Sequence, residues 1–148
     1  MTARALAFGP PSAGCRLAIS LPEGRLLAGR GLELTLVFRN EGPSDAELSR
    51  SWLWTEYQLK VEDAAGRAVP ATRFARQVAS GGRGAGVQGF LKVRPGEDVA
   101  DTLLLNRLFD LSVAETYTVE ASRSARVLPA RERVTVVSGR IVFELGEA

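Results

Sequence analysis

Three stretches of the chain alternate strictly between apolar and polar residues, and this pattern indicates β-strands. Residues 32–38 read Leu-Glu-Leu-Thr-Leu-Val-Phe, and the same alternation returns in residues 57–61 and 117–121. A side-chain period of two gives a strand one buried face and one solvated face. We therefore predict antiparallel sheets that bury their inner faces against each other.

Further segments of this kind bring the expected total to about seven to nine strands, with turn signals every 8 to 12 residues, as two packed sheets require. Gly66 suits a turn after residues 57–62 because it tolerates a positive φ. A short helical turn is expected within residues 106–112. The other expected strands are 15–21, 90–93, 99–105, 134–137 and 140–145, of which the last two are either a pair or one strand bulged at Ser138-Gly139. The fold class predicted is all-β, an antiparallel β-sandwich.

The length of 148 residues fits one domain with a single core. Residues 1–14 show no alternation and contain Gly9, Pro10 and Pro11, so we predict an irregular N-terminal arm followed by a sandwich domain over 15–148. Residues 71–89 also lack periodicity and carry five glycines. We predict a long loop there, because glycine-rich segments without a pattern rarely form regular structure.

The chain has no histidine, and this absence removes most enzyme mechanisms. Imidazole relays and most zinc, copper and iron sites depend on that side chain. Gly84, Gly86 and Gly89 match the spacing of a dinucleotide-binding loop, but a strand is expected after them where that loop needs a helix. Asp98 and Asp101 should lie on opposite faces of one strand, which prevents a shared site. We predict no catalytic, cofactor-binding or metal-ligating residue, no enzymatic activity, and no small-molecule ligand.

Composition and charge narrow the partner classes further. The net charge is only +2, and Phe74 is the single aromatic residue within the arginine-bearing loop, so nucleic acid is not an expected partner. No apolar run approaches the roughly 18 residues of a membrane-spanning helix. The N-terminal apolar run is interrupted at Gly9, so we expect no secretory leader and favour the cytoplasm. The arginine-rich, lysine-poor usage is typical of GC-rich bacterial coding.

Candidate contact residues cluster around the predicted loop. Trp52 and Trp54 alternate just before strand 57–62, and we expect one ring to pack in the core and the other to face a partner. Tyr117 is expected to form a tyrosine corner, with its hydroxyl bonded to the preceding crossover. The predicted partner-binding residues are Trp52, Trp54, Arg73, Phe74, Arg76 and Arg83.

Residues 31–42, 57–70 and 95–119 together resemble a bacterial immunoglobulin-like module. Such modules occur as accessory domains beside secreted metallopeptidases and in uncharacterised bacterial proteins. The resemblance implies an immunoglobulin-like β-sandwich and specifies no functional residue. We therefore expect a non-catalytic interaction module that binds a protein partner through loops or an edge strand. A small proteinase inhibitor and a self-associating structural subunit remain the alternatives.

Overall fold

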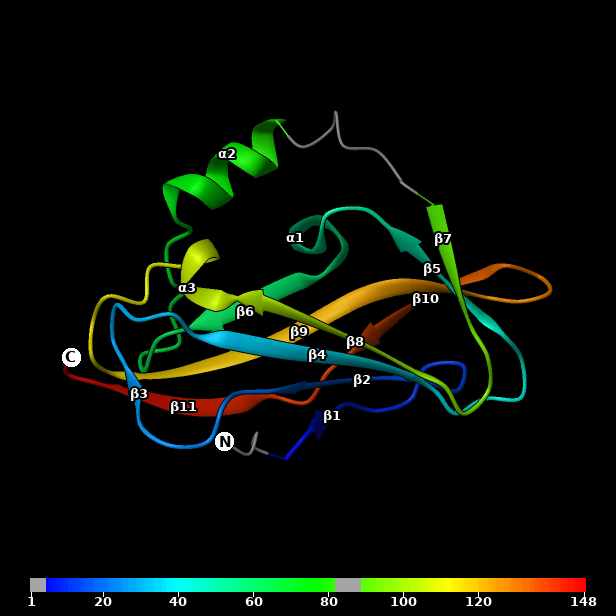
Figure 1. The fold of residues 1–148 in the computed structure, drawn as a ribbon, viewed down its shortest axis with the longest axis horizontal. Helices are drawn as coiled ribbons and strands as arrows, with labels where there is room; N and C mark the ends of the chain where they lie inside the picture. Colours follow the sequence, from blue (N-terminus) through cyan, green and yellow to red (C-terminus); the bar gives the residue numbers. More distant parts are fainter. Residues whose placement is uncertain (1–4, 82–88) are drawn as a thin grey trace.

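The computed structural model describes residues 5–81 and 89–148, which form two stacked sheets whose strand pairs are antiparallel except for the parallel pair of β3 and β11 (Figure 1). One sheet has the strand order β1-β2-β4-β8, and the other has the order β3-β11-β9-β5-β7, with β6 and β10 also paired to β9. The predicted all-β fold is confirmed. The described residues hold eleven strands instead of seven to nine, because β1 and β3 are additional two-residue strands and β5 (Ala46–Arg50) was not among the predicted strands.

The first sheet consists of β1 (Ala7–Phe8), β2 (Cys15–Ser20), β4 (Glu33–Asn40) and β8 (Asp98–Leu104). The second consists of β3 (Leu26–Leu27), β5 (Ala46–Arg50), β6 (Gln58–Glu62), β7 (Gly89–Val93), β9 (Thr116–Val127), β10 (Glu132–Val137) and β11 (Ile141–Gly146). Three helices complete the described part: α1 (Leu53–Glu56), α2 (Arg73–Gly81) and α3 (Leu105–Leu108).

The core lies between the inner faces that the alternating pattern predicted. Leu34, Leu36 and Phe38 of β4 are fully buried, and they meet Val119 and Ala121 of β9 in one apolar cluster. Full burial of a side chain of this size contributes about 1.5–3 kcal/mol. Packing between the two layers therefore supplies the main stabilisation of the fold.

The strand order identifies an immunoglobulin-like sandwich. β2, β4 and β8 correspond to strands A, B and E, and β6, β9 and β11 correspond to C, F and G of that fold. In constant-type domains a fourth strand, D, pairs with E. Here β7 pairs with β5 in the opposite sheet, so β8 has no strand on its outer side among the described residues. Within the described part, the seven residues of β8 therefore have no strand partner on their outer side, and α1 packs near the 102–104 end of that edge.

β10 and β11 are one strand with a bulge, which was one of the two predicted arrangements. Both pair antiparallel with β9, and three residues separate Val137 from Ile141 where their partners Ser122 and Val119 are separated by two. The extra residue is accommodated at Ser138-Gly139, where the buried Ser138 hydroxyl donates to the Gly139 carbonyl and accepts from the Ala121 amide.

β5 and β6 both pair along the same side of β9, but between them the chain leaves the sheet in a longer excursion. β5 pairs with Val127 and Arg126, and β6 pairs with residues 118–122, so residues 123–125 have no ladder partner on that side. The excursion between the two strands contains α1. The second sheet is therefore split at its centre.

Several local expectations are confirmed and others are wrong. The Tyr117 hydroxyl donates to the Val113 carbonyl at 2.7 Å, which is the predicted tyrosine corner, and Gly66 has φ +78°. The loop predicted over 71–89 is wrong in its first half, because Arg73–Gly81 is helix α2; residues 82–88 lie outside the described part. Within the predicted N-terminal arm, Ala7–Phe8 forms β1 and pairs with β2.

Candidate interaction surface

One aromatic cluster lies in the part of the molecule that carries α1, α2 and α3, which we call the helical end. It consists of Trp52, Trp54 and Phe74. The two indole rings are stacked, with centroids 5.1 Å apart and planes 8° apart. Phe74 from α2 meets the Trp54 ring edge-on at 5.7 Å. The guanidinium carbon of Arg107 lies 4.3 Å from the centroid of the Phe74 ring. We call these four residues the tryptophan surface.

Neither tryptophan belongs to the core, which corrects the prediction that one of them packs between the sheets. Trp52 precedes α1 and is 48% exposed, and Trp54 lies within α1 and is half-buried. The excursion between β5 and β6 carries both rings out of the sheet. They bury area against each other instead of against the opposite layer.

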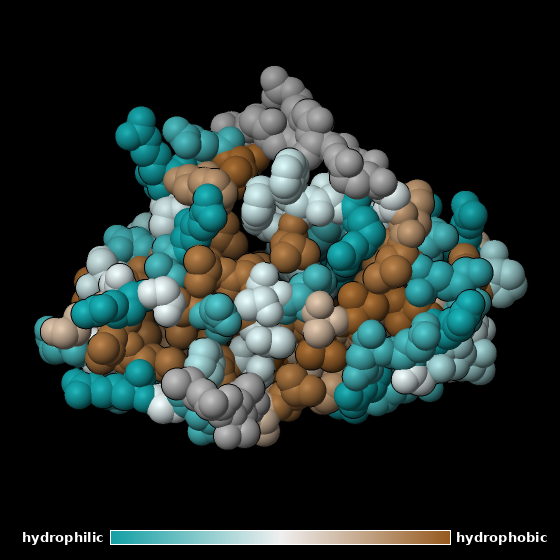
Figure 2. Space-filling view, in the orientation of Figure 1, coloured by the Kyte–Doolittle hydropathy of each residue, from teal (hydrophilic) through white to brown (hydrophobic). Residues whose placement is uncertain are grey.

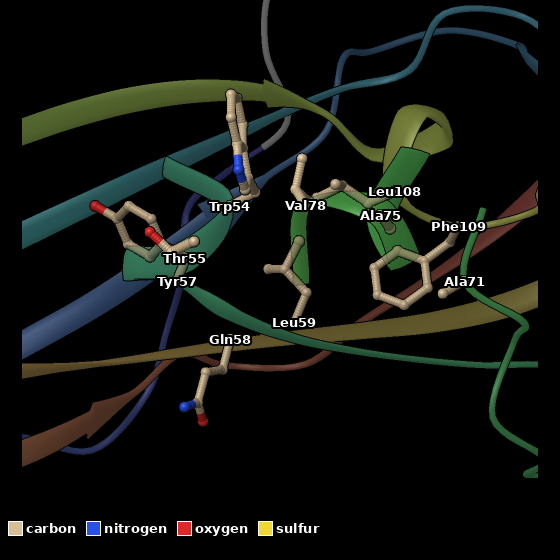
Figure 3. A pocket seen from close by; sticks show the side chains of 10 residues that line it. All are labelled: Trp54, Thr55, Tyr57, Gln58, Leu59, Ala71, Ala75, Val78, Leu108 and Phe109. Atoms are coloured by element: carbon tan, nitrogen blue, oxygen red, sulfur yellow. The ribbon is translucent and has the colours of Figure 1, made fainter. Parts of the chain in front are cut away.

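An apolar pocket of about 320 Å³ lies between α1, α2 and β6. Trp54 and Phe109 stand at opposite ends of it, with Leu59 and Val78 between them, and the Gln58 amide points away (Figure 3). The space-filling view shows apolar side chains around a hollow between α2 and the sheets (Figure 2).

A second apolar pocket, of about 200 Å³, lies on the other side of Trp54, against the end of β8. Its walls come from α1, α2, α3 and β8. The lining residues are Leu53, Trp54, Phe74, Thr102, Leu103, Leu104, Arg107 and Leu108. The tryptophan surface and the open sheet edge therefore meet at this pocket.

The hydrogen bonds of β8 show which of its backbone groups point to the open edge. The Leu105 amide donates to the Leu32 carbonyl at 2.8 Å, and the Asn40 amide donates to the Glu97 carbonyl at 3.1 Å, both in the register of the β4–β8 ladder. Bonded and non-bonded positions alternate in an antiparallel pair. Residues 98, 100, 102 and 104 therefore direct their N–H and C=O groups away from β4.

Ion pairs and a buried hydroxyl hold β8 in place at both faces. Arg39 binds Asp98 through two hydrogen bonds of 2.8 and 3.0 Å, which lower the pKa of that carboxyl. On the opposite face Asp101 accepts from the Tyr57 hydroxyl at 3.0 Å and lies 3.6 Å from Arg50. Burial raises the pKa of Tyr57 to about 12. The two aspartates lie on opposite faces of β8, as predicted.

The remaining predicted contact residues do not join the tryptophan surface. Arg73 and Arg76 are exposed on α2 and line a different cavity, of about 410 Å³, beside Asp110. Arg76 donates to the Ala71 carbonyl at 2.6 Å. Arg83 lies outside the described residues. Arg107 was not predicted, because only the packing of α3 against α2 places it over Phe74.

The described residues lack both a cluster of metal-ligating side chains and a helix that could span a membrane. Among residues 5–81 and 89–148, no group of three or more potential His, Cys, Asp or Glu ligands could hold a metal ion. No helix in the described part is long and apolar enough to cross a membrane.

Comparison with known proteins supports the fold and does not assign a family. No protein-family model and no curated protein sequence matches the chain. A Northeast Structural Genomics Consortium target is similar at 14% identity and a TM-score of 0.54, covering 93% of this chain and 90% of that one. The putative ApaA protein from Bordetella pertussis is similar at 12% identity and a TM-score of 0.51, covering 99% and 94%. At these identities the likeness shows the sandwich fold alone.

Proposed function

We propose that the chain is a non-catalytic protein-interaction module that takes up an extended segment of a partner protein along β8. The observation that carries the proposal is the stacked tryptophan pair, of which Trp52 is exposed, beside a seven-residue sheet edge that has no strand partner in the described part of the chain. Strand addition takes its affinity from unpaired backbone groups at a sheet edge, and tryptophan is among the residues enriched as anchors of protein interfaces.

The geometry favours an extended polypeptide as the occupant. Residues 98, 100 and 102 offer backbone donors and acceptors at the spacing of a β-ladder, whereas the carbonyl of Leu104 belongs to the N-cap of α3. The 200 Å³ pocket touches residues 102–104, so an apolar side chain of the added strand would enter it beside Trp54 and Phe74. The backbone bonds would supply affinity for any extended segment, and the pocket would select an apolar residue.

The sequence-based alternatives predict other outcomes. A self-associating subunit would place a second copy of β8 on the same edge, and light scattering would then show a dimer or polymer. A proteinase inhibitor would present a rigid loop to a protease, and it would act without the β8 edge. The association with metallopeptidases implied by the resemblance stays an expectation.

The test is to select binders from a library of random peptides long enough to span β8, and to compare variants of the full chain. Thr102→Pro removes a backbone N–H that points to the open edge without removing a bond to β4. The matched control Thr102→Val keeps that N–H. We expect Thr102→Pro to weaken selected peptides roughly ten-fold, which corresponds to about 1.4 kcal/mol, and Thr102→Val to leave affinity unchanged.

A second pair of variants tests the aromatic anchor. Trp52→Ala should weaken the same peptides by at least roughly ten-fold, as expected for an interface anchor. Val142→Ala, which also changes an exposed apolar side chain, should have no effect. Peptides that bind Thr102→Pro and Trp52→Ala as tightly as the unmodified chain would overturn the proposal, provided urea unfolding shows that both variants are folded.

A further inference from the structure

The split in the second sheet opens a polar cavity of about 420 Å³ over the centre of β9. It lies where residues 123–125 lack a ladder partner between β5 and β6. Hydroxyl, amide and guanidinium groups dominate its walls. The lining residues are Ser49, Thr55, Glu56, Gln58, Ser122, Arg123, Ser124, Arg133 and Thr135.

Arg123 is the buried residue of this cavity, at 3% exposure. Its guanidinium donates to the Ser49 carbonyl and to Glu56, both at 3.1 Å, and makes a longer bond to the Ser124 carbonyl. The guanidinium carbon also lies 4.8 Å from the centroid of the Tyr57 ring.

The Nη1 atom of Arg123 is buried and has no hydrogen-bond partner in the described part of the chain. A buried donor without an acceptor costs about 1–3 kcal/mol, and more when the group is charged. The protein therefore buries a charged donor beside this cavity and supplies no acceptor for that donor among the described residues.

The rim of the cavity adds a second unusual feature. Arg133 of β10 stands directly opposite Arg126 of β9 in the strand register. Like charges placed opposite each other destabilise a sheet unless a counter-charge lies between them. Arg133 is exposed and reaches the Ser124 hydroxyl only at 3.5 Å. Thr135, opposite Ser124, adds a further hydroxyl on the same face.

The carboxylates nearby leave a positive charge in excess. Glu56 is held by Arg123 and by the Ser49 hydroxyl at 2.6 Å, and Glu47 stands opposite Arg126 in the register. Arg133 has no carboxylate partner among the ion pairs of the described residues. A smaller cavity of about 170 Å³, with Arg126 and Phe90 in its wall, shares Ser49, Ser124 and Arg133 with the first.

From this arrangement we propose that the cavity between β5 and β6 binds a phosphate group, with Arg133 at its rim, Arg123 at its floor and the hydroxyls of Ser122, Ser124 and Thr135 around it. A phosphate accepts more hydrogen bonds than a carboxylate, which suits a wall with this many donors. The proposal departs from the sequence-based expectation of no small-molecule ligand. It uses a different site from the β8 edge.

Titration with inorganic phosphate, followed through the backbone amide shifts of the full chain, tests the site. We expect saturable shifts in residues 122–124 and 133–135. Arg133→Gln should weaken this binding by at least roughly ten-fold, as loss of a charge-assisted contact implies. Arg140→Gln is the matched control, because it removes an exposed arginine that lines neither cavity. We expect it to bind phosphate like the unmodified chain.

Two further probes identify the chemistry of the ligand. Acetate should bind much more weakly than phosphate at equal ionic strength, and equal binding would overturn the phosphate assignment. Tighter binding of phosphoserine than of inorganic phosphate would identify a phosphate ester as the ligand, and the reverse order would identify the free ion. Absence of saturable shifts, or equal affinity in Arg133→Gln, would overturn the site itself.

Discussion

At the scale of single residues, Tyr117 ties the crossover before β9 to the sheet through one hydrogen bond. Its hydroxyl donates to the Val113 carbonyl at 2.7 Å, and its ring stacks on Phe143 at 5.7 Å. A tyrosine hydroxyl is protonated and can donate at neutral pH, and burial raises its pKa further here. The ring of Tyr117 therefore stabilises the fold by packing, and its hydroxyl stabilises the crossover by a hydrogen bond.

Tyr117→Phe should lower the free energy of unfolding by about 1–2 kcal/mol, because it removes the bond and leaves the Val113 carbonyl without its partner. Urea unfolding measures the change. Val113→Ala is the control, since that side chain is exposed and the carbonyl is kept. A Tyr117→Phe variant as stable as the unmodified chain would show that water replaces the bond at no cost.

The sequence predicts the position of a residue correctly where that position follows from the local alternation of apolar and polar residues. Tyr117 begins an alternating strand after a crossover, which is the position of a tyrosine corner. The alternation of residues 117–121, continued two residues further, puts Arg123 on the inner face, but the predicted pattern ended before that residue. The stacking of Trp52 on Trp54 has no such signal, because it depends on the excursion between β5 and β6.

At the scale of elements, α2 shows why one helix was missed. Thr72 caps its start, with the hydroxyl accepting from the Ala75 amide at 3.1 Å, and Phe74 and Val78 share one face at the helical spacing. Both signals are present in the sequence. The run of glycines that begins at Gly81, the last residue of α2, dominated the interpretation of the whole segment.

β1 depends on a close backbone contact that only glycine permits. A Cβ atom at Gly9 would lie 1.8 Å from the Val137 carbonyl oxygen. The Gly9 amide donates to the Leu17 carbonyl, and the Gly139 amide donates to the Ala7 carbonyl, each at 3.0 Å. The N-terminal strand is therefore pressed against the bulge between β10 and β11.

Gly9→Ala should push β1 off the sheet and cost about 1–3 kcal/mol, as overpacking typically does. Hydrogen exchange provides the specific readout, because the Gly139 amide should lose its protection while amides in β4 keep theirs. Gly31→Ala is the control, since a Cβ there would meet only the Leu104 side chain, at 3.9 Å. Unchanged protection of Gly139 in Gly9→Ala would contradict this account.

At the scale of the whole molecule, the helices and the sandwich differ in how firmly they are held. β4 and β9 bury side chains completely, whereas α1 has no buried residue and α2 makes few contacts outside α3. Regions with few buried apolar contacts open at lower free energy than the core. The alternating pattern predicted the sandwich because burial there repeats along each strand, and the helical end lacks any such repeat.

The two tryptophans of the chain both lie in the helical end, so their fluorescence reports on that region alone. We expect urea to change tryptophan fluorescence at a lower concentration than far-UV circular dichroism, which reports on the strands. Non-coincident transitions of this kind show that unfolding is not all-or-none. Phe74→Ala removes the ring that packs on Trp54, and it should move the fluorescence transition to still lower urea while leaving the circular dichroism transition in place. Superimposable transitions in the unmodified chain would instead mean that α1, α2 and the two sheets unfold as one unit, so that the tryptophan surface is as rigid as the core beneath it.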